Sequence, residues 1–250
     1  MKTRYACIIF AAGWLLLSAW PANAQAQSTS QLVVPAEVVL YAPPALKSRD
    51  FIQPLVCALK RVLVAPVETE ALDISFSRDM MATRTQLDVE KVGNHFLQTT
   101  AKDGTNLSFK YLLLPYDLKA QGLNYVFSTS FGNNTTSYHF GVVSTARLDV
   151  DDPLREHHKG AAITALRVYK LILKSIARVA GLGSPERCIL AFPRSLPELD
   201  QKSAEFCPED RTALVAAGIL KSDERDTGDC IVVSERQVLP LLALSDKHRE

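Results

Sequence analysis

Acidic residues are absent from one long stretch of this sequence, since none occurs between His157 and Pro185. Charge is otherwise balanced: 28 Lys and Arg face 27 Asp and Glu, for a formal net charge of +1. A generic nucleic-acid-binding protein carries a clear excess of positive charge. Nucleic acid is therefore not expected as a partner. Internal repeats and low-complexity segments are also missing, which excludes repeat and fibrous architectures.

Long uncharged apolar runs are missing except near the N-terminus. There, residues 6–20 form such a run, preceded by two basic residues and followed by Ala22-Asn23-Ala24. This layout is typical of a secretory signal peptide over residues 1–24, cleaved after Ala24. The alternative is an uncleaved anchor, but the run is shorter than the roughly 20 residues that a helical span needs. We expect residues 25–250 to be periplasmic or secreted, with no membrane span after cleavage.

Closely spaced cysteine pairs are missing too, because neither CxxC nor CxxxxC occurs. Structural zinc sites usually take their cysteines from such short pairs. Of the five cysteines, Cys7 lies in the predicted signal peptide. An even number then remains, which in an oxidising compartment favours disulfides with the connectivity left open. The remaining cysteines are Cys57, Cys188, Cys207 and Cys230.

Apolar periodicity predicts alternating strands and helices in one domain over residues 25–250, with a C-terminal tail from about residue 211. A long helix should begin at Asp152-Pro153 and stop at Gly181-Leu182-Gly183. The turn residues Gly132-Asn133-Asn134 predict an antiparallel hairpin. Together these elements indicate an α/β sandwich with a mixed sheet. The predicted strands are 32–41, 109–114, 123–128 and 139–148, and the other predicted helices cover 51–62 and 83–99.

The long predicted helix has two faces. Its apolar stripe, toward the core, consists of Leu166, Tyr169, Leu173, Ile176 and Ala180. Its basic stripe consists of Arg167, Lys170, Lys174 and Arg178. The basic stripe fits a solvated face that is partly neutralised by acidic residues before the helix, as charged helix faces usually are. Those acidic residues are Asp149, Asp151, Asp152 and Glu156.

Four blocks of the sequence, taken in order, resemble the archaemetzincin family of zinc-dependent proteases. The first three are Thr83 to Leu87 (T-R-T-Q-L), Tyr116 to Phe127 with its D-L and N-Y-V-F elements, and Val142 to Leu148 (V-V-S-T-A-R-L). The fourth has the spacing of the family's H-E-x-x-H-x-x-G-x-x-H helix. The resemblance covers roughly residues 80–210 and implies a metzincin or zincin-like sandwich with a long former active-site helix. The fourth block keeps Arg167, Lys170, Gly181, Cys188, Asp200, Lys202, Phe206 and Cys207.

The sequence departs from the family at the positions that carry the chemistry. The three histidine positions hold Lys174, Arg178 and Ser184, and the glutamate position holds Ser175. The methionine of the turn becomes Leu190, and two of the family's four cysteines become Pro185 and Asp210. Lysine and arginine offer no lone pair at neutral pH and repel a cation. A serine hydroxyl is a poor general base. We therefore expect no metal, no other cofactor and no zinc-dependent hydrolysis at this site.

Other residues offer weaker alternatives for a catalytic or metal site. His157 and His158, with His139 nearby in sequence, resemble a surface metal site, but adjacent residues of a helix point about 100° apart. Ser175 and Lys174 suggest a Ser-Lys nucleophile, yet they too are adjacent and diverge. The resemblance gives Cys188 and Cys207 the positions of zinc ligands that have lost their partners. A disulfide between them, with a contribution of about 3 kcal/mol, is the simpler interpretation. Cys57 and Cys230 would then pair by elimination.

Our leading hypothesis is an exported, non-catalytic protein that uses the former cleft for binding. Strand addition would place an extended peptide on a cleft edge strand. We assign that edge to Val142, Val143, Ser144, Thr145, Ala146 and Arg147. Lys174 and Arg178 would favour an acidic group in the guest. Alternatively, both cations pair with Asp117 or Asp149 and the cleft is filled. The competing functions are a peptidase with a rearranged metal site, an unrelated hydrolase and a structural envelope protein.

Overall fold

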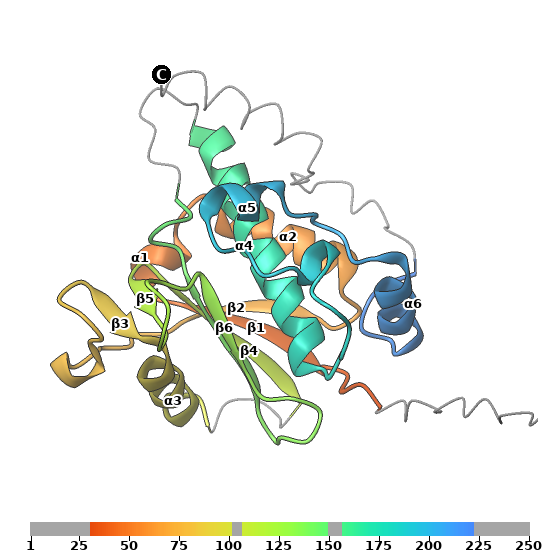
Figure 1. Cartoon of the computed structure of the whole chain (residues 1–250), viewed down its shortest axis with the longest axis horizontal. Helices are drawn as coiled ribbons and strands as arrows, with labels where there is room; N and C mark the ends of the chain where they lie inside the picture. Colours follow the sequence, from red (N-terminus) through yellow and green to blue (C-terminus); the bar gives the residue numbers. More distant parts are fainter. Residues whose placement is uncertain (1–30, 102–106, 150–156, 223–250) are drawn as a thin grey trace, which may run out of the picture.

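Four parallel strands and one antiparallel strand form the central sheet, in the order β2-β1-β4-β7-β6 (Figure 1). A separate parallel pair, β3 and β5, lies beside it. The computed structural model describes residues 31–101, 107–149 and 157–222. The strands are β1 Glu37–Ala42, β2 Val67–Ala71, β3 Gln86–Asp88, β4 Ser108–Leu114, β5 Asp117–Lys119, β6 Ser128–Phe131 and β7 His139–Ser144. The helices are α1 Pro44–Lys47, α2 Ile52–Val62, α3 Val89–Thr99, α4 His157–Val179, α5 Leu196–Gln201 and α6 Pro208–Ala216, with 3-10 turns η1 Arg78–Met80 and η2 Cys188–Leu190.

The sheet has a hydrophobic core on each face, because successive side chains of a strand point to opposite sides. In β1, Val38 and Leu40 belong to the larger core, which α2 and α4 complete. Val39 and Tyr41 belong to the smaller core, which α3 completes. Figure 1 shows α2 and α4 on one side of the sheet and α3 on the other. The predicted α/β class with a mixed sheet and an antiparallel hairpin is confirmed.

The position of the edge strand was predicted wrongly. β7 lies between β4 and β6, so Val142, Val143 and Ser144 are interior to the sheet, and Thr145 to Arg147 follow the strand. Every residue of β7 is buried, as its nearly continuous apolar sequence requires of a strand covered on both faces. The edge is β6, whose Ser-Thr-Ser-Phe sequence is only partly buried. The predicted strand over 123–128 is also misplaced, since β6 begins at Ser128.

Helix boundaries follow capping residues more closely than apolar spacing. The helix predicted from residue 83 begins at Val89, because the Asp88 carboxylate accepts hydrogen bonds from the backbone N–H groups of Glu90 and Lys91. α4 ends as predicted, with Gly181 at a φ of 99° just after it. The predicted start at Asp152-Pro153 lies outside the described residues.

Residues that we placed in a C-terminal tail instead belong to the core. Leu214 of α6 and Ile219 are fully buried. Leu220 forms an antiparallel bridge with Leu63, just after α2. The domain therefore extends at least to the end of the described residues at Ser222. The predicted signal peptide lies outside them, and no helix within residues 31–101, 107–149 and 157–222 is long and apolar enough to cross a membrane.

Candidate functional site

The first half of the basic stripe on α4 is buried and holds the C-terminal segment in place. Arg167 donates from Nε and Nη2 to the two carboxylate oxygens of Asp200, both at 2.7 Å, and from Nη1 to the carbonyl of Leu148 at 2.9 Å. Lys170 is 1% exposed, and its Nζ donates to the carbonyls of Leu199 at 3.2 Å and Asp200 at 3.0 Å. The expectation of a solvated basic face is therefore wrong for this half.

The second half of the stripe consists of the two cations at former histidine positions. Lys174 Nζ donates to the carbonyl of Ala191 at 3.3 Å and lies 3.8 Å from the Glu186 carboxylate. Arg178 Nη1 donates to the carbonyls of Leu182 at 3.1 Å and Ser184 at 2.7 Å. The alternative prediction, that Lys174 and Arg178 pair with Asp117 or Asp149, is wrong. Asp117 pairs with Arg147, and Asp149 pairs with Arg49.

Arg178 links the helix directly to the turn that follows it. The family resemblance places metal ligands at positions 178 and 184, so a bound zinc would join the same two positions. Here the guanidinium of Arg178 bonds the backbone of Ser184 instead. The turn between them depends on Gly181, where an added Cβ would lie 2.7 Å from the Cβ of Asn134. The donors present point at carbonyl oxygens and carry positive charge, so these residues do not fit a zinc ion.

Ser175, at the former glutamate position, is a packed residue. It is 3% exposed, and its Oγ accepts a hydrogen bond of 2.7 Å from Ser130 Oγ on β6. Burial raises the pKa of the neighbouring Tyr111, an effect that Ser175 only partly offsets. An added Cβ at Gly141 would lie 2.8 Å from the Tyr111 ring and 3.1 Å from Ser175 Oγ. Because Lys174 bonds to Ala191 instead, nothing supports a Ser-Lys nucleophile.

Lys202 is a further cation near Lys174, and it was not among the predicted site residues. It is 7% exposed, and its Nζ has no hydrogen-bond partner among the described residues. Burial, followed by repulsion from Lys174 and Lys170, lowers the pKa of Lys202 to about 7, against a smaller opposing effect of Glu186. Burial also lowers the pKa of Lys174. No residue pattern around position 202 predicts that this lysine is buried.

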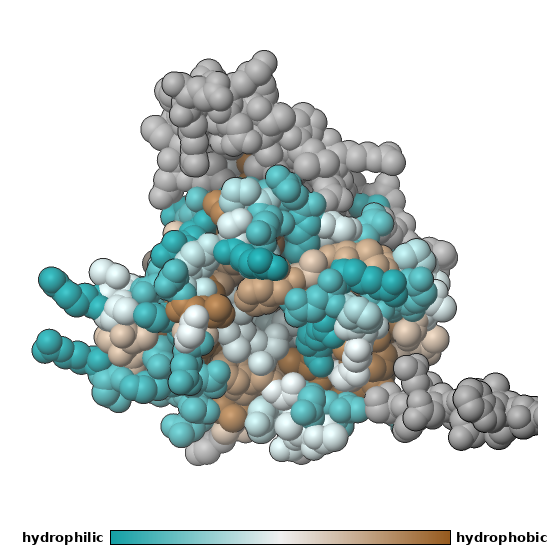
Figure 2. All heavy atoms as spheres, in the orientation of Figure 1, coloured by the Kyte–Doolittle hydropathy of each residue, from teal (hydrophilic) through white to brown (hydrophobic). Residues whose placement is uncertain are grey.

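A cleft of about 530 Å³ opens between β6 and α4, so the alternative of a filled cleft is wrong. Figure 2 shows a hollow in this face of the molecule with apolar residues around it. Its floor includes Leu171, Lys174 and Ser175 of α4. No acidic residue of the described chain lines it. The remaining lining residues are Ala120, Gly122 to Ser130 and Phe192 to Arg194.

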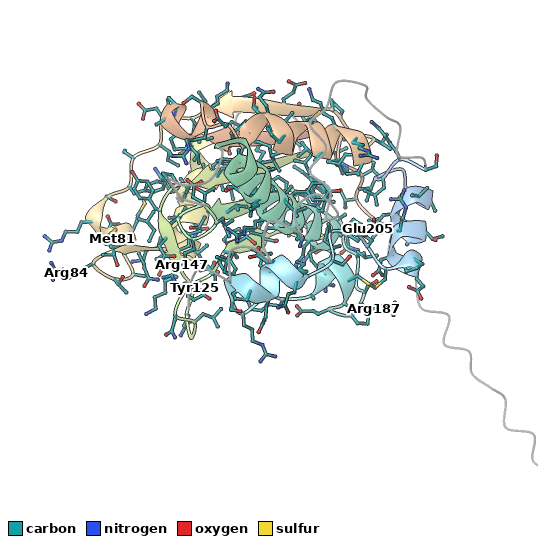
Figure 3. The ribbon with its side chains drawn as sticks, turned by 90° about the horizontal axis from the view of Figure 1, so that it is seen from above. Met81, Arg84, Tyr125, Arg147, Arg187 and Glu205 are labelled. Atoms are coloured by element: carbon teal, nitrogen blue, oxygen red, sulfur yellow. A yellow bond between two sulfur atoms is a disulfide. The ribbon has the colours of Figure 1, made fainter. Side chains whose placement is uncertain are left out.

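One wall of the cleft is fixed by polar residues from three of the resembling blocks. Arg147 donates two hydrogen bonds to Asp117, at 2.8 and 2.6 Å, and its guanidinium lies 4.1 Å from the Tyr125 ring centre (Figure 3). Gln86 donates to Asp117 at 3.0 Å. Although burial raises the pKa of Asp117, the bonds from Arg147 and Gln86 hold it below its usual value. Tyr125 Oη in turn donates to the carbonyl of Arg194 at 2.9 Å, across the cleft mouth.

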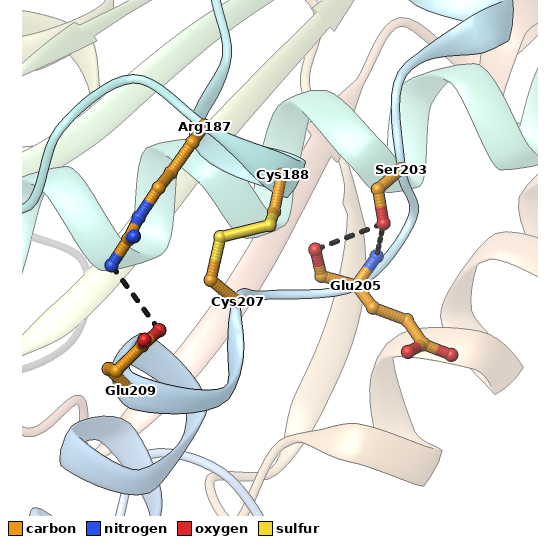
Figure 4. The surroundings of a disulfide bond; sticks show 6 residues. All are labelled: Arg187, Cys188, Ser203, Glu205, Cys207 and Glu209. Carbon is orange, nitrogen blue, oxygen red and sulfur yellow. Dashed lines mark hydrogen bonds and ion pairs between the residues drawn. A yellow bond between two sulfur atoms is a disulfide. The ribbon is translucent and has the colours of Figure 1, made fainter.

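The predicted disulfide between Cys188 and Cys207 is confirmed (Figure 4). Its Cα atoms are 5.5 Å apart, and it ties η2 to the start of α6. Beside it Arg187 pairs with Glu209 at 3.3 Å. Cys57 is also disulfide-bonded. Its predicted partner, Cys230, lies outside the described residues, so that pairing stays a prediction.

The histidine alternative receives no support within the described residues. His139 is buried in the sheet, where its ring stacks on Phe109 at 4.8 Å and its Nε2 contacts the Asn133 carbonyl at 2.9 Å. The side chains of His157 and His158 lie outside the described part of the structure. Among described residues no group of three or more His, Cys, Asp and Glu side chains could hold a metal ion.

Comparison with known proteins identifies relatives of this chain. No protein-family model matches it. An archaemetzincin from Methanopyrus kandleri is 38% identical over 93 residues, which make up 36% of this chain and 46% of that protein. The matched segment thus spans less than half of the relative's length.

Solved structures share the fold. The crystal structure of the Methanopyrus kandleri archaemetzincin has a TM-score of 0.55 at 22% identity, covering 77% of this chain and 98% of that one. The Archaeoglobus fulgidus archaemetzincin, complexed with malonate, has 0.54 at 20%, covering 71% and 99%. A zinc-dependent peptidase from Methanocorpusculum labreanum has 0.53 at 22%, covering 71% and 99%. The chain is thus similar to an archaemetzincin over a 93-residue stretch of sequence, and it shares the fold of archaemetzincins and of a zinc-dependent peptidase.

Proposed function

We propose that this protein is a non-catalytic member of the archaemetzincin family that binds an extended peptide in the former active-site cleft. The observation that carries the proposal is the open cleft of about 530 Å³, whose floor holds Lys174 and Ser175 in place of a metal ligand and a base. The cleft offers apolar walls and an adjoining strand edge, but no group suited to hydrolysis. Binding without turnover is the activity that these residues support best.

The outer edge of β6 supports strand addition. The Ser144 N–H donates to the Phe127 carbonyl, so this opposed pair is hydrogen-bonded. Opposed pairs in an antiparallel ladder alternate between bonded and non-bonded. Thr129 therefore bonds to Val142, while the backbone groups of Ser128 and Ser130 point away from β7. No described strand pairs with that side of β6. A guest peptide would find both hydrogen-bonding groups and the cleft beside them.

Export of the protein is part of the proposal. The Cys188–Cys207 disulfide supports it, because disulfides persist mainly in oxidising compartments. The N-terminal layout supports it as well. Cell fractionation with mass analysis of the recovered protein tests this directly. We expect a periplasmic or secreted chain that begins at Gln25, whereas a cytosolic chain that keeps residues 1–24 contradicts export.

Strand addition is tested by comparing Ser130→Pro with Ser130→Ala on an array of random-sequence peptides of about ten residues, enough to run along a strand. Proline removes the outward N–H of Ser130 without breaking the bonds between β6 and β7. Alanine keeps that N–H, so its affinity is the reference. We expect a subset of peptides to bind uncleaved and to be lost in the proline variant. Equal binding by both variants excludes strand addition, and cleavage of the peptides excludes a non-catalytic role.

A further inference from the structure

We propose that the cleft selects guests that carry a carboxylate next to an apolar group, and that Lys174 and Arg194 bind the carboxylate. This inference rests on the proposed binding role of the cleft and specifies its ligand. Both residues line the cleft, Lys174 as a partly buried residue and Arg194 as an exposed one. The lining contains these two cations and no carboxylate of its own among the described residues. A neutral or basic guest would leave that charge uncompensated.

Positive charge on buried lysines close to Lys174 strengthens this selectivity. Lys202 lies close enough to Lys174 and Lys170 for mutual repulsion, and its buried Nζ has no hydrogen-bond partner in the described part of the chain. Lys170 already donates to two carbonyls. Glu186, whose side chain is 56% exposed and lies 3.8 Å from Lys174, partly offsets the charge of Lys174 and Lys202. The pair is long and its carboxylate is more than half exposed to water, so it is weak and a guest carboxylate can replace it.

The apolar part of the guest has a defined place. Lys174 Nζ lies 5.0 Å from the centre of the Phe192 ring, so the cation is flanked by an aromatic wall. Leu123 and Phe192, which both line the cleft, are 41% and 46% exposed. Contact with an apolar guest would cover these side chains. The same walls lower the local dielectric constant and strengthen a charge-assisted hydrogen bond to Lys174.

The test uses two probes of the same shape, phenylpropionate and its neutral amide, titrated into the full-length protein with detection by NMR. We expect the acid to bind about tenfold more tightly than the amide, the size of one charge-assisted hydrogen bond. Lys174→Gln should remove most of the preference for the acid over the amide. Lys174→Arg keeps the charge and should restore most of the preference. Arg194→Gln should cost only about two- to fivefold, because this side chain is exposed.

A variant of opposite sign makes the test sharper. Glu186→Gln removes the competing carboxylate and should raise affinity for the acid about two- to fivefold. Lys60→Gln, an exposed lysine of α2 that does not line the cleft, should change nothing. Equal affinity for acid and amide in the unmodified protein overturns the inference but leaves peptide binding intact. Binding of neither probe overturns the inference, and the peptide array then decides whether the proposed function also fails.

The source of the carboxylate is separated by three acetylated peptides of alanine and leucine. One has a free C-terminus, the second is amidated, and the third is amidated with one internal glutamate. Preference for the first identifies a peptide C-terminus as the guest, and preference for the third identifies an acidic side chain. Either result supports carboxylate selection, whereas equal binding of all three contradicts it.

Discussion

The family resemblance implies a metal cross-link at two positions, and this chain holds each of them together by other means. We call them the cysteine turn (Cys188 and Cys207) and the former catalytic position (Lys174, Arg178 and Ser184). At the cysteine turn, Cys188 and Cys207 remain from four family cysteines and bond to each other. At the former catalytic position no histidine remains, and Arg178 ties α4 to the next turn through the Ser184 carbonyl. The first link is a neutral covalent bond. The second is made by the charged guanidinium group of a partly buried arginine.

The two sites differ in how much uncompensated positive charge they contain. The disulfide needs only two residues at a suitable distance. The former catalytic position accumulates Lys170, Lys174, Arg178 and Lys202, and the Lys202 ammonium has no described hydrogen-bond partner. A buried, poorly compensated cation costs stability. Such groups are concentrated at functional sites. The disulfide therefore acts as a supporting link, whereas the cations are the groups that we propose bind a guest.

Loss of the covalent link should have the largest effect on stability. Replacing both cysteines, with Cys188→Ser and Cys207→Ser, should lower the free energy of unfolding by about 3 kcal/mol, because the unfolded chain regains loop entropy. Urea unfolding at neutral pH measures this. The exposed Arg187–Glu209 pair beside the disulfide provides the control, since Arg187→Gln should cost less than about 1 kcal/mol. Equal costs in the two variants would show that the disulfide adds nothing.

Loss of the cationic link should be the next largest effect. Arg178→Met removes two hydrogen bonds to carbonyls and should cost about 2 kcal/mol. Arg194→Gln, an exposed arginine whose side chain makes no ion pair within the described residues, is the matched control and should stay within about 0.5 kcal/mol in the same urea experiment. A neutral Arg178→Met variant contradicts its role as a cross-link.

The uncompensated cation should make stability depend on pH. Burial lowers the pKa of Lys202 to about 7 in the folded chain from 10.5 for a solvated lysine, so between these pH values the unfolded state binds more protons. The free energy of unfolding should therefore rise with pH between about 7 and 10.5. Below pH 7 both states are protonated and the full cost of burial is present.

Urea unfolding at several pH values, for the parent and Lys202→Met, isolates this effect. The methionine variant should be more stable at neutral pH and should lose the rise with pH. Lys60→Gln controls for removal of an exposed lysine and should keep the rise. If Lys202→Met keeps the same slope as the parent, Lys202 is not the buried cation responsible.

The smallest effect should come from the hydroxyl pair between β6 and α4. Ser130→Ala removes the donor to buried Ser175 and should cost about 1 kcal/mol. Ser128→Ala, on the same strand, should be close to neutral, because no described hydrogen bond involves its side chain. Thermal unfolding of the two variants is sufficient to rank them. Equal costs would show that the Ser130–Ser175 bond is not specifically stabilising.

Local patterns predicted more of the fold than of the site. Spacing placed Arg167, Lys170, Lys174 and Arg178 on one face of α4, but it could not show which segment covers that face. The covering groups are mostly backbone carbonyls of residues 182–200, which no residue pattern marks. The order of strands is likewise non-local. Polarity was the available signal, since the Ser-Thr-Ser-Phe sequence of β6 fits an edge better than buried β7 does.

Two further differences have separate causes. The predicted helix over 83–99 began too early, because apolar spacing outweighed the capping carboxylate of Asp88. Lys202 was noted only as a residue shared with the family, since burial of an isolated lysine depends on segments distant in the sequence. The Cys188–Cys207 disulfide was predictable because the family resemblance placed both cysteines at one site.

Zinc content tests the central claim most directly. Elemental analysis should be run on the purified protein beside a variant with Lys174→His, Ser175→Glu, Arg178→His and Ser184→His. The account predicts no stoichiometric zinc in the unmodified protein, because Lys174 and Arg178 direct positive charge and hydrogen-bond donors at carbonyl oxygens. The four-residue variant, which regains the ligand set, should bind zinc. One zinc per unmodified chain, lost on Lys174→Gln, would contradict the account.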